Sequence, residues 1–340
     1  MIELDGSTGE GGGQILRTAL TLSMITGQPF RIANIRANRH PPGLRRQHLA
    51  AVRAAAVISG ARVSQAEVGS TQLEFTPGTV HGGIFEFDIG TAGSTTLVLQ
   101  TLIPALLFAA HPSVVTVTGG THNPKAPPAQ FLQRAWCRLL SAMGADVQVD
   151  LERYGFYPAG GGRIGASVWP CRQLQRLDLL ARGTQREAYA ELVLASLPEQ
   201  IAQREAAALH DLLGWQADQV RAPLTPASSS PGNAVLLTIE SGNVTEVFSA
   251  IGERGVPAEA VVRDAALEVR RYLASGAAVG EHLGDQLMLP MALAGGGSYT
   301  LDHVSPHAIT NAEVIARFLP VTVSFRNQAR MATCTIVRSM

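Results

Sequence analysis

The feature that most constrains the fold is an internal repeat in which a short strand pattern, a glycine-rich turn and an apolar helix pattern occur three times. Each copy leads to a glutamine at the start of an apolar stretch, and these glutamines are Gln14, Gln100 and Gln286. The first two lie 86 residues apart and the last two 186 residues apart. The third copy therefore carries about one hundred extra residues, which is the size of a domain.

A second feature repeats with nearly the same offsets. It is a proline-containing loop before another helix pattern, found at Ala37–Leu44, His122–Ala129 and Val304–Asn311. Because the two features share their spacing, chance similarity does not account for the pattern. We expect a mixed α/β (α+β) fold in which three βαβαβ-type units form a large domain and a smaller α/β domain is inserted in the third repeat.

The same spacing predicts the domain limits. The large domain is expected over residues 1–183 and 277–340, with repeats at about 1–80, 81–170, and 171–183 together with 277–340, and the inserted domain over 184–276. Alternating segments predict strands at Val114–Thr118 and Val147–Leu151. Inside the insert we expect helices near Pro198–Leu213 and Ala258–Leu273, a strand at Ala234–Glu240 and a loop at Ala222–Gly232.

Composition excludes several classes of protein. The 340 residues include 27 Lys+Arg, 27 Asp+Glu and 46% hydrophobic residues, which is typical of a globular protein of about two domains. A net charge near zero argues against bulk electrostatic binding of long nucleic acids. The three cysteines, Cys137, Cys171 and Cys334, are too far apart for a zinc site or a disulfide framework, so we expect them to be buried.

From its sequence we expect the chain to carry neither a membrane span nor a secretion signal. The apolar run Thr101–Ala110 contains Pro104 and is too short to span a bilayer, so it predicts a buried helix and no membrane association. The acidic start Met1–Asp5 has no charged-then-apolar leader, which predicts a cytoplasmic protein. An oligomer is compatible with the sequence, which carries no signal for or against one.

Basic residues are distributed unevenly. Lys125 is the only lysine, whereas five arginines crowd into one short stretch, namely Arg31, Arg36, Arg39, Arg45 and Arg46. Arginine forks match phosphate oxygens bidentately, so this stretch predicts a phosphate-binding surface. A solvated helix face is the alternative.

The run Gly9–Gln14 places Glu10 among glycines between a strand and a helix. It has neither the Walker A nor the Rossmann spacing. The run is either a tight turn or an anion site at a helix N-terminus, in which Glu10 holds a divalent cation and Arg17 faces the same ligand.

The third copy carries a comparable run at Gly280–Gln286. Asp285 in this run is either a cap or first-turn residue of a helix, or part of a nucleotide site near Gln100. Three helix starts that converge on one centre would make a composite site.

The third proline-containing loop carries His307. We expect Thr310 or Asn311 to cap the helix that follows. A neutral imidazole can attack phosphorus, so His307 is a candidate nucleophile rather than a surface histidine. No Gly-x-Ser-x-Gly motif is present to support an esterase.

Four runs together resemble the RNA 3′-terminal phosphate cyclases, and the similarity covers essentially the whole chain. They are Gly9–Arg17, Pro42–His48, Gly155–Gly162 and Ser305–Asn311. The resemblance implies three α/β units with a smaller insert. It also implies conversion of an RNA 3′-phosphate to a 2′,3′-cyclic phosphodiester, with ATP and a divalent cation, Mg or Mn. The implied intermediates are an adenylated His307 and RNA-(3′)pp(5′)A, with release of pyrophosphate and AMP.

The resemblance also implies the site residues. Those of the catalytic centre are His307, Glu10, Arg17, Arg36, Arg39 and Gln47, with Glu10 as the metal ligand. Those that contact ATP are Gln100, His282, Leu283, Gly284, Asp285 and Gln286. Because the remaining arginines are scattered, we expect contact with only the terminal nucleotides of RNA.

Two alternatives remain open. The repeated units also resemble the enolpyruvyl transferases, although with Lys125 as the only lysine a site built on several lysines and arginines is harder to assemble. The other alternative is a non-catalytic relative that acts as a ribosome-assembly scaffold, in which the loop histidine would be dispensable.

Overall fold

The computed structural model describes residues 1–9 and 12–339. In this part of the chain, three four-stranded sheets share one topology, with strand orders β1-β2-β4-β3, β5-β6-β8-β7 and β9-β13-β15-β14. In each, the first two strands of the repeat pair in parallel and the remaining pairs are antiparallel. The repeating unit is thus βαβαββ: the predicted βαβαβ-type unit ends in a pair of antiparallel strands in each repeat.

The first repeat places two helices between its strands. Its elements are β1 (Ile2–Asp5), α1 (Gln14–Thr26), β2 (Phe30–Ala33), α2 (Arg46–Ser59), β3 (Arg62–Ser64) and β4 (Leu73–Thr76). Both helices end at a glycine, Gly27 or Gly60, in the left-handed conformation that glycine adopts at low cost.

The second repeat contains the apolar helix expected around Thr101–Ala110. Its elements are β5 (Ile84–Asp88), α3 (Thr95–Leu106), β6 (Ser113–Gly119), α4 (Ala129–Phe131), the π-helical turn η1 (Leu132–Trp136), α5 (Cys137–Ala142), β7 (Val147–Arg153) and β8 (Gly162–Val168). Ser94 caps α3 by accepting a hydrogen bond from the Leu97 amide, and nearly all of α3 is buried. No helix in residues 1–9 and 12–339 has the length and apolar character needed to cross a membrane.

The third repeat begins before the insert and resumes after it. Its elements are β9 (Leu177–Leu179), α8 (Glu281–Leu293), β13 (Gly296–Leu301), α9 (Pro306–Phe318), β14 (Val321–Asn327) and β15 (Ala332–Arg338). The parallel pairing of Leu179 with Tyr299 shows that the insert interrupts one sheet without breaking it.

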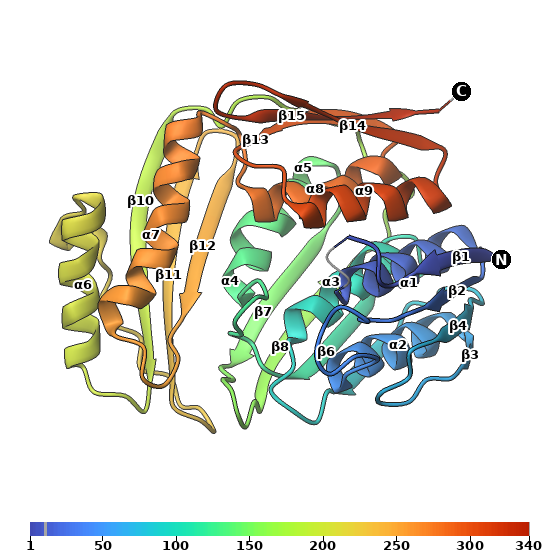
Figure 1. Ribbon diagram of the computed structural model, residues 1–340, viewed down its shortest axis with the longest axis horizontal. Coiled ribbons are helices and arrows are strands. Elements are labelled where there is room, and N and C mark those ends of the chain that lie inside the picture. Colours follow the sequence, from blue (N-terminus) through green and yellow to red (C-terminus); the bar gives the residue numbers. More distant parts are fainter. Residues whose placement is uncertain (10–11, 340) are drawn as a thin grey trace.

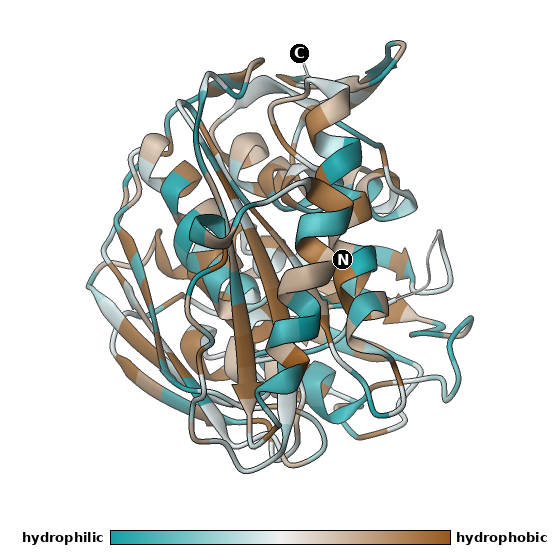
Figure 2. Cartoon of the chain, turned by 90° about the vertical axis from the view of Figure 1, so that its left-hand side faces the viewer, coloured by the Kyte–Doolittle hydropathy of each residue, from teal (hydrophilic) through white to brown (hydrophobic). Residues whose placement is uncertain are grey.

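The segment between β9 and α8 forms its own antiparallel sheet, which stands beside the three repeats (Figure 1). Its elements are β10 (Gln185–Ala195), α6 (Gln200–Leu213), the short η2 (Ala217–Gln219), β11 (Gly232–Ser241), β12 (Thr245–Ile251) and α7 (Ala258–Ser275). Figure 2 faces this side and shows the long strands mostly apolar, whereas the helices alternate polar and apolar residues. The domain limits at residues 184 and 276 stay a prediction.

The largest hydrophobic clusters follow this arrangement of the repeats and the insert, and a small third cluster joins Phe156 to the insert strands β10 and β11. One hydrophobic cluster runs through all three repeats and includes Leu16, Leu102 and Leu287 of the central helices α1, α3 and α8. A second cluster, which includes Leu237 and Tyr272, belongs to the insert. Cys137, Cys171 and Cys334 are buried and free, as expected.

Candidate active site

One helix from each repeat lines a narrow central cavity of about 40 Å³. The three glutamines that mark the repeat, Gln14, Gln100 and Gln286, all border it, together with Pro104 and Pro290. The structure therefore brings equivalent positions of α1, α3 and α8 around one centre. The cavity has room for a few water molecules, so a nucleotide would occupy its open side.

Gln14, at the start of α1, links an acid to the candidate nucleophile. Its Nε2 donates to both carboxylate oxygens of Asp285, at 2.8 and 2.6 Å, while its Oε1 lies 3.0 Å from Nδ1 of His307. Because the amide nitrogen faces the carboxylate, the amide oxygen is the acceptor for the imidazole. This network assigns the proton to Nδ1 of His307 and the lone pair to Nε2.

Asp285 is buried and holds α8 against α9. Its Oδ1 and its backbone carbonyl accept hydrogen bonds from Nδ2 of Asn311, at 3.0 and 3.1 Å. Burial raises the pKa of the Asp285 carboxyl, and the donors Gln14 and Asn311 counteract this shift. The prediction that Asp285 caps a helix or occupies its first turn is wrong, because α8 begins four residues earlier at Glu281.

The start of α9 also differs from the expectation. Ser305 caps this helix by accepting a hydrogen bond from the Ala308 amide at 3.1 Å, so neither Thr310 nor Asn311 is the cap. Asn311 instead accepts a hydrogen bond from Thr18 of α1 at 2.8 Å. The helix that carries His307 is therefore fastened to α1 as well as to α8.

The side chains of Arg17 and His48 lie next to Gly13. The half-buried Arg17 of α1 has a pKa lowered to about 10 by desolvation, which Asp285 opposes, and it stays charged at neutral pH. The imidazole of His48 lies so close to Gly13 that a Cβ there would collide with its Nε2. Burial and the charges of Arg17 and its neighbours lower the pKa of His48 to about 3, so this ring is neutral.

The five arginines of the arginine-rich stretch do not form one group: Arg36, Arg39 and Arg45 lie together, whereas Arg31 and Arg46 lie elsewhere. Arg36 donates to the carbonyls of Pro41 and Gly43, at 2.7 and 3.3 Å, from a left-handed backbone with φ of 54°. Burial, followed by the charges of Arg45 and Arg39, lowers the pKa of Arg36. These three cations therefore lie close together.

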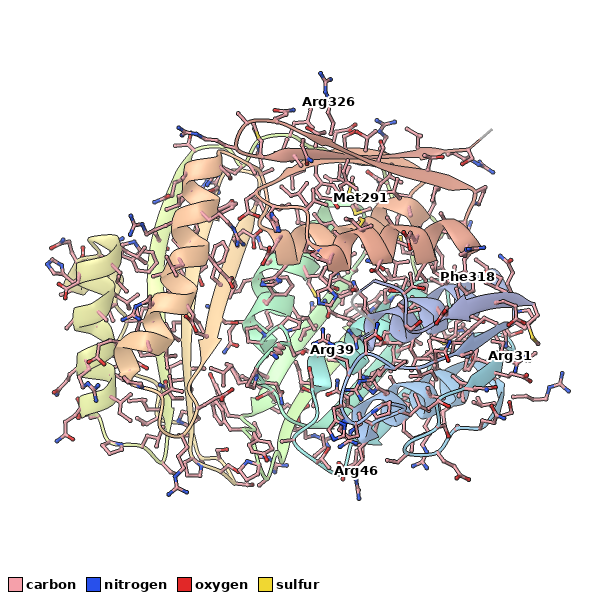
Figure 3. The ribbon with its side chains drawn as sticks, in the orientation of Figure 1. Arg31, Arg39, Arg46, Met291, Phe318 and Arg326 are labelled. Atoms are coloured by element: carbon pink, nitrogen blue, oxygen red, sulfur yellow. The ribbon has the colours of Figure 1, made fainter. Side chains whose placement is uncertain are left out.

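The other two arginines of that stretch lie elsewhere. Arg31 sits on β2 at the outer sheet, where it contacts Gln72 at 3.0 Å and Glu74 at 3.8 Å, well away from Arg39 (Figure 3). Arg46 lies at the lower edge in the same view, near Gly90. The prediction of one surface made of all five arginines is wrong, because a β-strand carries Arg31 away from the loop.

Gln47 and Gln100 have different roles in the structure. The Oε1 of Gln47 accepts a hydrogen bond from the Ser94 amide at 3.2 Å, which joins α2 to the start of α3. Gln100 is buried, and within residues 1–9 and 12–339 neither its amide nitrogen nor its amide oxygen has a hydrogen-bond partner. An unpaired buried amide that borders a cavity is a group ready for a polar ligand or water.

The remaining predicted nucleotide contacts lie along α8. Leu283 and Gly284 pack inside the protein, where a Cβ on Gly284 would meet Leu301 and Tyr299 at 3.2 and 3.3 Å. They do not line the cavity. Gln286 does, and its backbone carbonyl accepts a hydrogen bond from the Trp136 indole at 3.3 Å.

His282 lies one turn before Asp285, with 66% of its side chain exposed. Its Nε2 is 3.7 Å from Glu268 and 3.6 Å from Glu281. Partial desolvation opposes its charge, but these two carboxylates outweigh it and raise the pKa of His282 to about 9. The three side chains are also close enough to hold a cation. Glu10 lies outside the described residues.

Comparison with known proteins decides the family. The family model described as RNA 3′-terminal phosphate cyclase matches residues 8–325. The chain belongs to the RNA 3′-terminal phosphate cyclase family. The prediction of a cyclase-family enzyme is thereby confirmed.

Curated cyclases match over nearly the full chain. The RNA 3′-terminal phosphate cyclase of Ralstonia nicotianae is 56% identical over 324 residues, which cover 95% of this chain and 93% of that protein. Those of Salmonella agona and Koribacter versatilis are 52% and 51% identical, with 97% and 98% of this chain and 96% and 95% of each relative covered.

Among solved structures, the enolpyruvyl transferase NikO from Streptomyces tendae matches at 11% identity with a TM-score of 0.36, over 98% of this chain and 48% of NikO. This score is too low to support an inference about activity.

Sequence reasoning about this cyclase-family chain missed four residues that the structure places in the site: Gln14, Thr18, His48 and Asn311. The repeat itself offered a signal for Gln14, because it is the equivalent of Gln100 and Gln286. Thr18, His48 and Asn311 each lie within or beside the runs that carry the family resemblance, but only the folded chain shows their partners.

Proposed function

We propose that this chain converts an RNA 3′-terminal phosphate to a 2′,3′-cyclic phosphodiester at the expense of ATP, with His307 as the covalent nucleophile. The observation that carries the proposal is the hydrogen-bonded array of Asp285, Gln14 and His307. An acid that orients an amide, which in turn orients an imidazole, fixes the tautomer that a nitrogen nucleophile needs.

In the first step, Nε2 of His307 attacks the α-phosphorus of ATP. The N–P bond forms, the bond to the β-phosphate breaks, and pyrophosphate leaves with the electron pair. Positive charge develops on the imidazole, and the Nδ1–H donates to Oε1 of Gln14, which stabilises that charge. Arg17 and the arginines beside Arg36 offset the negative charge of the phosphates.

The second step transfers the adenylate. A 3′-phosphate oxygen of RNA attacks the phosphorus of the His307 adduct, the N–P bond breaks, and its electron pair returns to Nε2. The product is RNA-(3′)pp(5′)A. In the third step the adjacent 2′-hydroxyl attacks the 3′-phosphorus, AMP leaves, and the hydroxyl proton passes to solvent. This ring closure is intramolecular, so proximity favours it.

A divalent cation is the remaining component of the proposal. Both carboxylate oxygens of Asp285 are bonded to amides, so this acid is not a ready metal ligand. Glu10 is therefore the carboxylate that we expect to hold Mg or Mn. The cation would supply charge that neutralises the phosphates of ATP.

The RNA contact is expected to be short. The described cations of the site are Arg17, Arg36, Arg39 and Arg45, so only terminal phosphates are bound and the salt dependence of RNA binding is weak. We place the reaction in the cytoplasm, where ATP and RNA ends are both present.

The test is to incubate the protein with α-³²P-ATP and a divalent cation, with His307→Ala as the matched variant. An acid-labile, base-stable label on the wild type alone is the expected result, because a phosphoramidate has this stability. Folded wild-type protein that takes up no label would overturn the mechanism and favour the transferase or scaffold alternatives.

A further inference from the structure

Helix α6 of the insert buries an acid among apolar residues. Glu205 is fully buried, on a face of α6 that otherwise consists of Ala202, Ala208 and Leu209. Acidic side chains are rarely fully buried without a partner. The partner of Glu205 is Asn233, the second residue of β11, whose Nδ2 donates to Oε1 of the acid at 2.6 Å.

Two atoms of this pair lack a hydrogen bond. Within residues 1–9 and 12–339, Oε2 of Glu205 and Oδ1 of Asn233 are buried and have no hydrogen-bond partner. Each belongs to the same planar group as the atom that is already bonded across the pair. An ionised carboxylate and an amide oxygen only accept hydrogen bonds, so these two oxygens cannot satisfy each other unless a proton lies between them.

The surroundings disfavour a negative charge on Glu205. Burial raises the pKa of its carboxyl to about 7, the hydrogen bond from Asn233 opposes this shift, and the negative charge of Glu259 on α7 adds to it. Arg204, the neighbour of Glu205 on α6, donates to the two carboxylate oxygens of Glu259 at 2.7 and 2.6 Å. The strands of the insert contribute apolar side chains to the same core, among them Leu192 of β10, Val235 of β11 and Phe248 of β12.

We propose that Glu205 and Asn233 form a buried proton-binding site, in which the Oε2–H of the neutral acid donates to Oδ1 of the amide. One proton then completes two side-by-side hydrogen bonds, N–H···O and O–H···O, and gives both oxygens a partner. When the acid ionises, the proton passes to solvent, the O–H···O bond is lost and two acceptors are left together in a buried place. The site takes no part in the reaction proposed above, and it makes the packing of α6 on β11 sensitive to pH.

The position of Asn233 connects this site to the second repeat. Its backbone carbonyl accepts a hydrogen bond at 2.9 Å from the amide of Gly252, the residue after β12. The residue before Asn233 is Gly232, which packs so closely on Phe156 that a Cβ would overlap the ring. The protonated pair therefore stabilises the end of β11 at which the insert meets the run Gly155–Gly162.

The first test is infrared spectroscopy of the full chain in heavy water. The C=O band of a neutral carboxyl group is separate from the bands of carboxylates and amides, and exposed acids are largely ionised at pH 5.5. At this pH, wild type should show one more neutral carboxyl group than Glu205→Gln, and the extra band should fade as pH rises through about 7. Glu246, whose pKa is also raised, is present in both proteins and cancels in the difference.

Equal numbers of neutral carboxyl groups in the two proteins would overturn the inference. An ionised Glu205 would then require a buried water molecule that donates to both oxygens.

Thermal unfolding gives an independent measurement. Glu205→Gln supplies a permanent donor to Oδ1 of Asn233, so this variant imitates the protonated pair at every pH. The unfolded chain releases the proton near pH 4.5 and the folded protein only near pH 7, so the stability that the proton contributes is complete below pH 4.5 and is lost as pH rises through 7. From pH 5 to pH 8, the Tm of Glu205→Gln should therefore rise by about 3 °C relative to that of wild type.

The matched control is Glu253→Gln, which removes an exposed acid from the loop after β12. Its Tm difference from wild type should be the same at pH 5 and pH 8. A Tm difference for Glu205→Gln that also stays constant over this range would contradict the proton site. Neither measurement uses ATP or RNA, so a failure of the proposed reaction leaves both readouts unchanged.

Hydrogen exchange locates the effect in the molecule. At pH 8 the amides of α6 should exchange faster in wild type than in Glu205→Gln, and this gap should nearly close at pH 5. Equal exchange of α6 in the two proteins at pH 8 would show that the proton does not hold this helix on β11.

Discussion

His122 and His307 stand 185 residues apart at equivalent places of two repeats, each in the proline-containing loop before a helix. His122 is fully buried and packs against the rings of Tyr154 and Phe156, at centroid distances of 5.0 and 5.5 Å. Its Nε2 lies 2.9 Å from Gln130, and burial lowers its pKa to about 4. His307 is instead exposed at the start of α9, with Gln14 at its Nδ1.

The two environments differ because of what the neighbouring segments supply. In the second repeat, the Gly155–Gly162 run folds over the loop, and its aromatic ring covers the imidazole. In the third repeat, the loop faces the first turn of α1 and the cations beside it. The repeat thus sets the position of the histidine, whereas the contacts between repeats decide whether its ring is buried as a packing residue or exposed, as the proposed nucleophile His307 is.

The strongest test of this contrast is His307→Asn. We expect RNA 3′-phosphate cyclisation to fall more than about 1,000-fold, because an amide cannot form the covalent adduct. The midpoint of thermal unfolding should not change, since the side chain is exposed. A variant that loses stability along with activity would give His307 the packing role that we assign to His122.

The next effect in size is expected for Asp285→Asn. The new amide nitrogen would face Nε2 of Gln14 at the 2.6 Å contact, and two donors repel each other. Gln14 then turns its amide and presents the nitrogen to His307, which selects the wrong tautomer. Single-turnover adenylation should slow roughly 100-fold, and a rate within a factor of three of wild type would contradict the network.

His122→Phe tests the other half of the comparison. The ring still stacks, but the side-chain oxygen of Gln130 loses its partner, so the free energy of unfolding should fall by about 2 kcal/mol. Urea denaturation measures this loss. The rate of cyclisation should stay within about twofold of wild type, and a large loss of activity from a stable His122→Phe protein would place this loop in the catalytic centre.

The smallest effect is a pH dependence. The unfolded chain protonates His122 near pH 6.5 but the folded protein only near pH 4, so the contribution of His122 to stability falls as pH falls below 6.5. Between pH 7 and pH 5.5 the difference in unfolding free energy between wild type and His122→Phe should therefore shrink by about 1 kcal/mol. A constant difference over this range would show that the buried ring titrates normally.

Much of the architecture could be predicted from the sequence, because strand and helix periodicities recur with equal offsets. The secondary structure of the insert was harder to predict from the sequence. Strand β10 contains the run Ala188–Ala195, rich in alanine and leucine, whose local preference is helical and is overridden by pairing with β11. The start of α8 was predicted too late for a different reason. A glycine such as Gly284 usually indicates the end of a helix, but here its lack of a Cβ lets α8 pack closely against Tyr299 and Leu301.

Individual residues of the site could be predicted from the sequence, but the contacts between them could not. Family resemblance indicated His307 and Asp285, yet the link between them could not be read from spacing. That link is Gln14, which is 271 residues from Asp285 and 293 from His307. Contacts at such separations follow from how the first and third repeats pack, which local periodicity does not encode.

The Gln14–Asp285 contact joins the first and third repeats, so it forms only after most of the chain has been synthesised. The ribosome releases the first repeat long before α8 and α9 are made, and contacts of such long range form late in folding. Until they form, the array that orients the nucleophile does not exist. In the proposed mechanism, a chain that lacks α8 and α9 therefore cannot form the covalent adduct with the nucleotide, and adduct formation requires that the third repeat is complete and packed on the first.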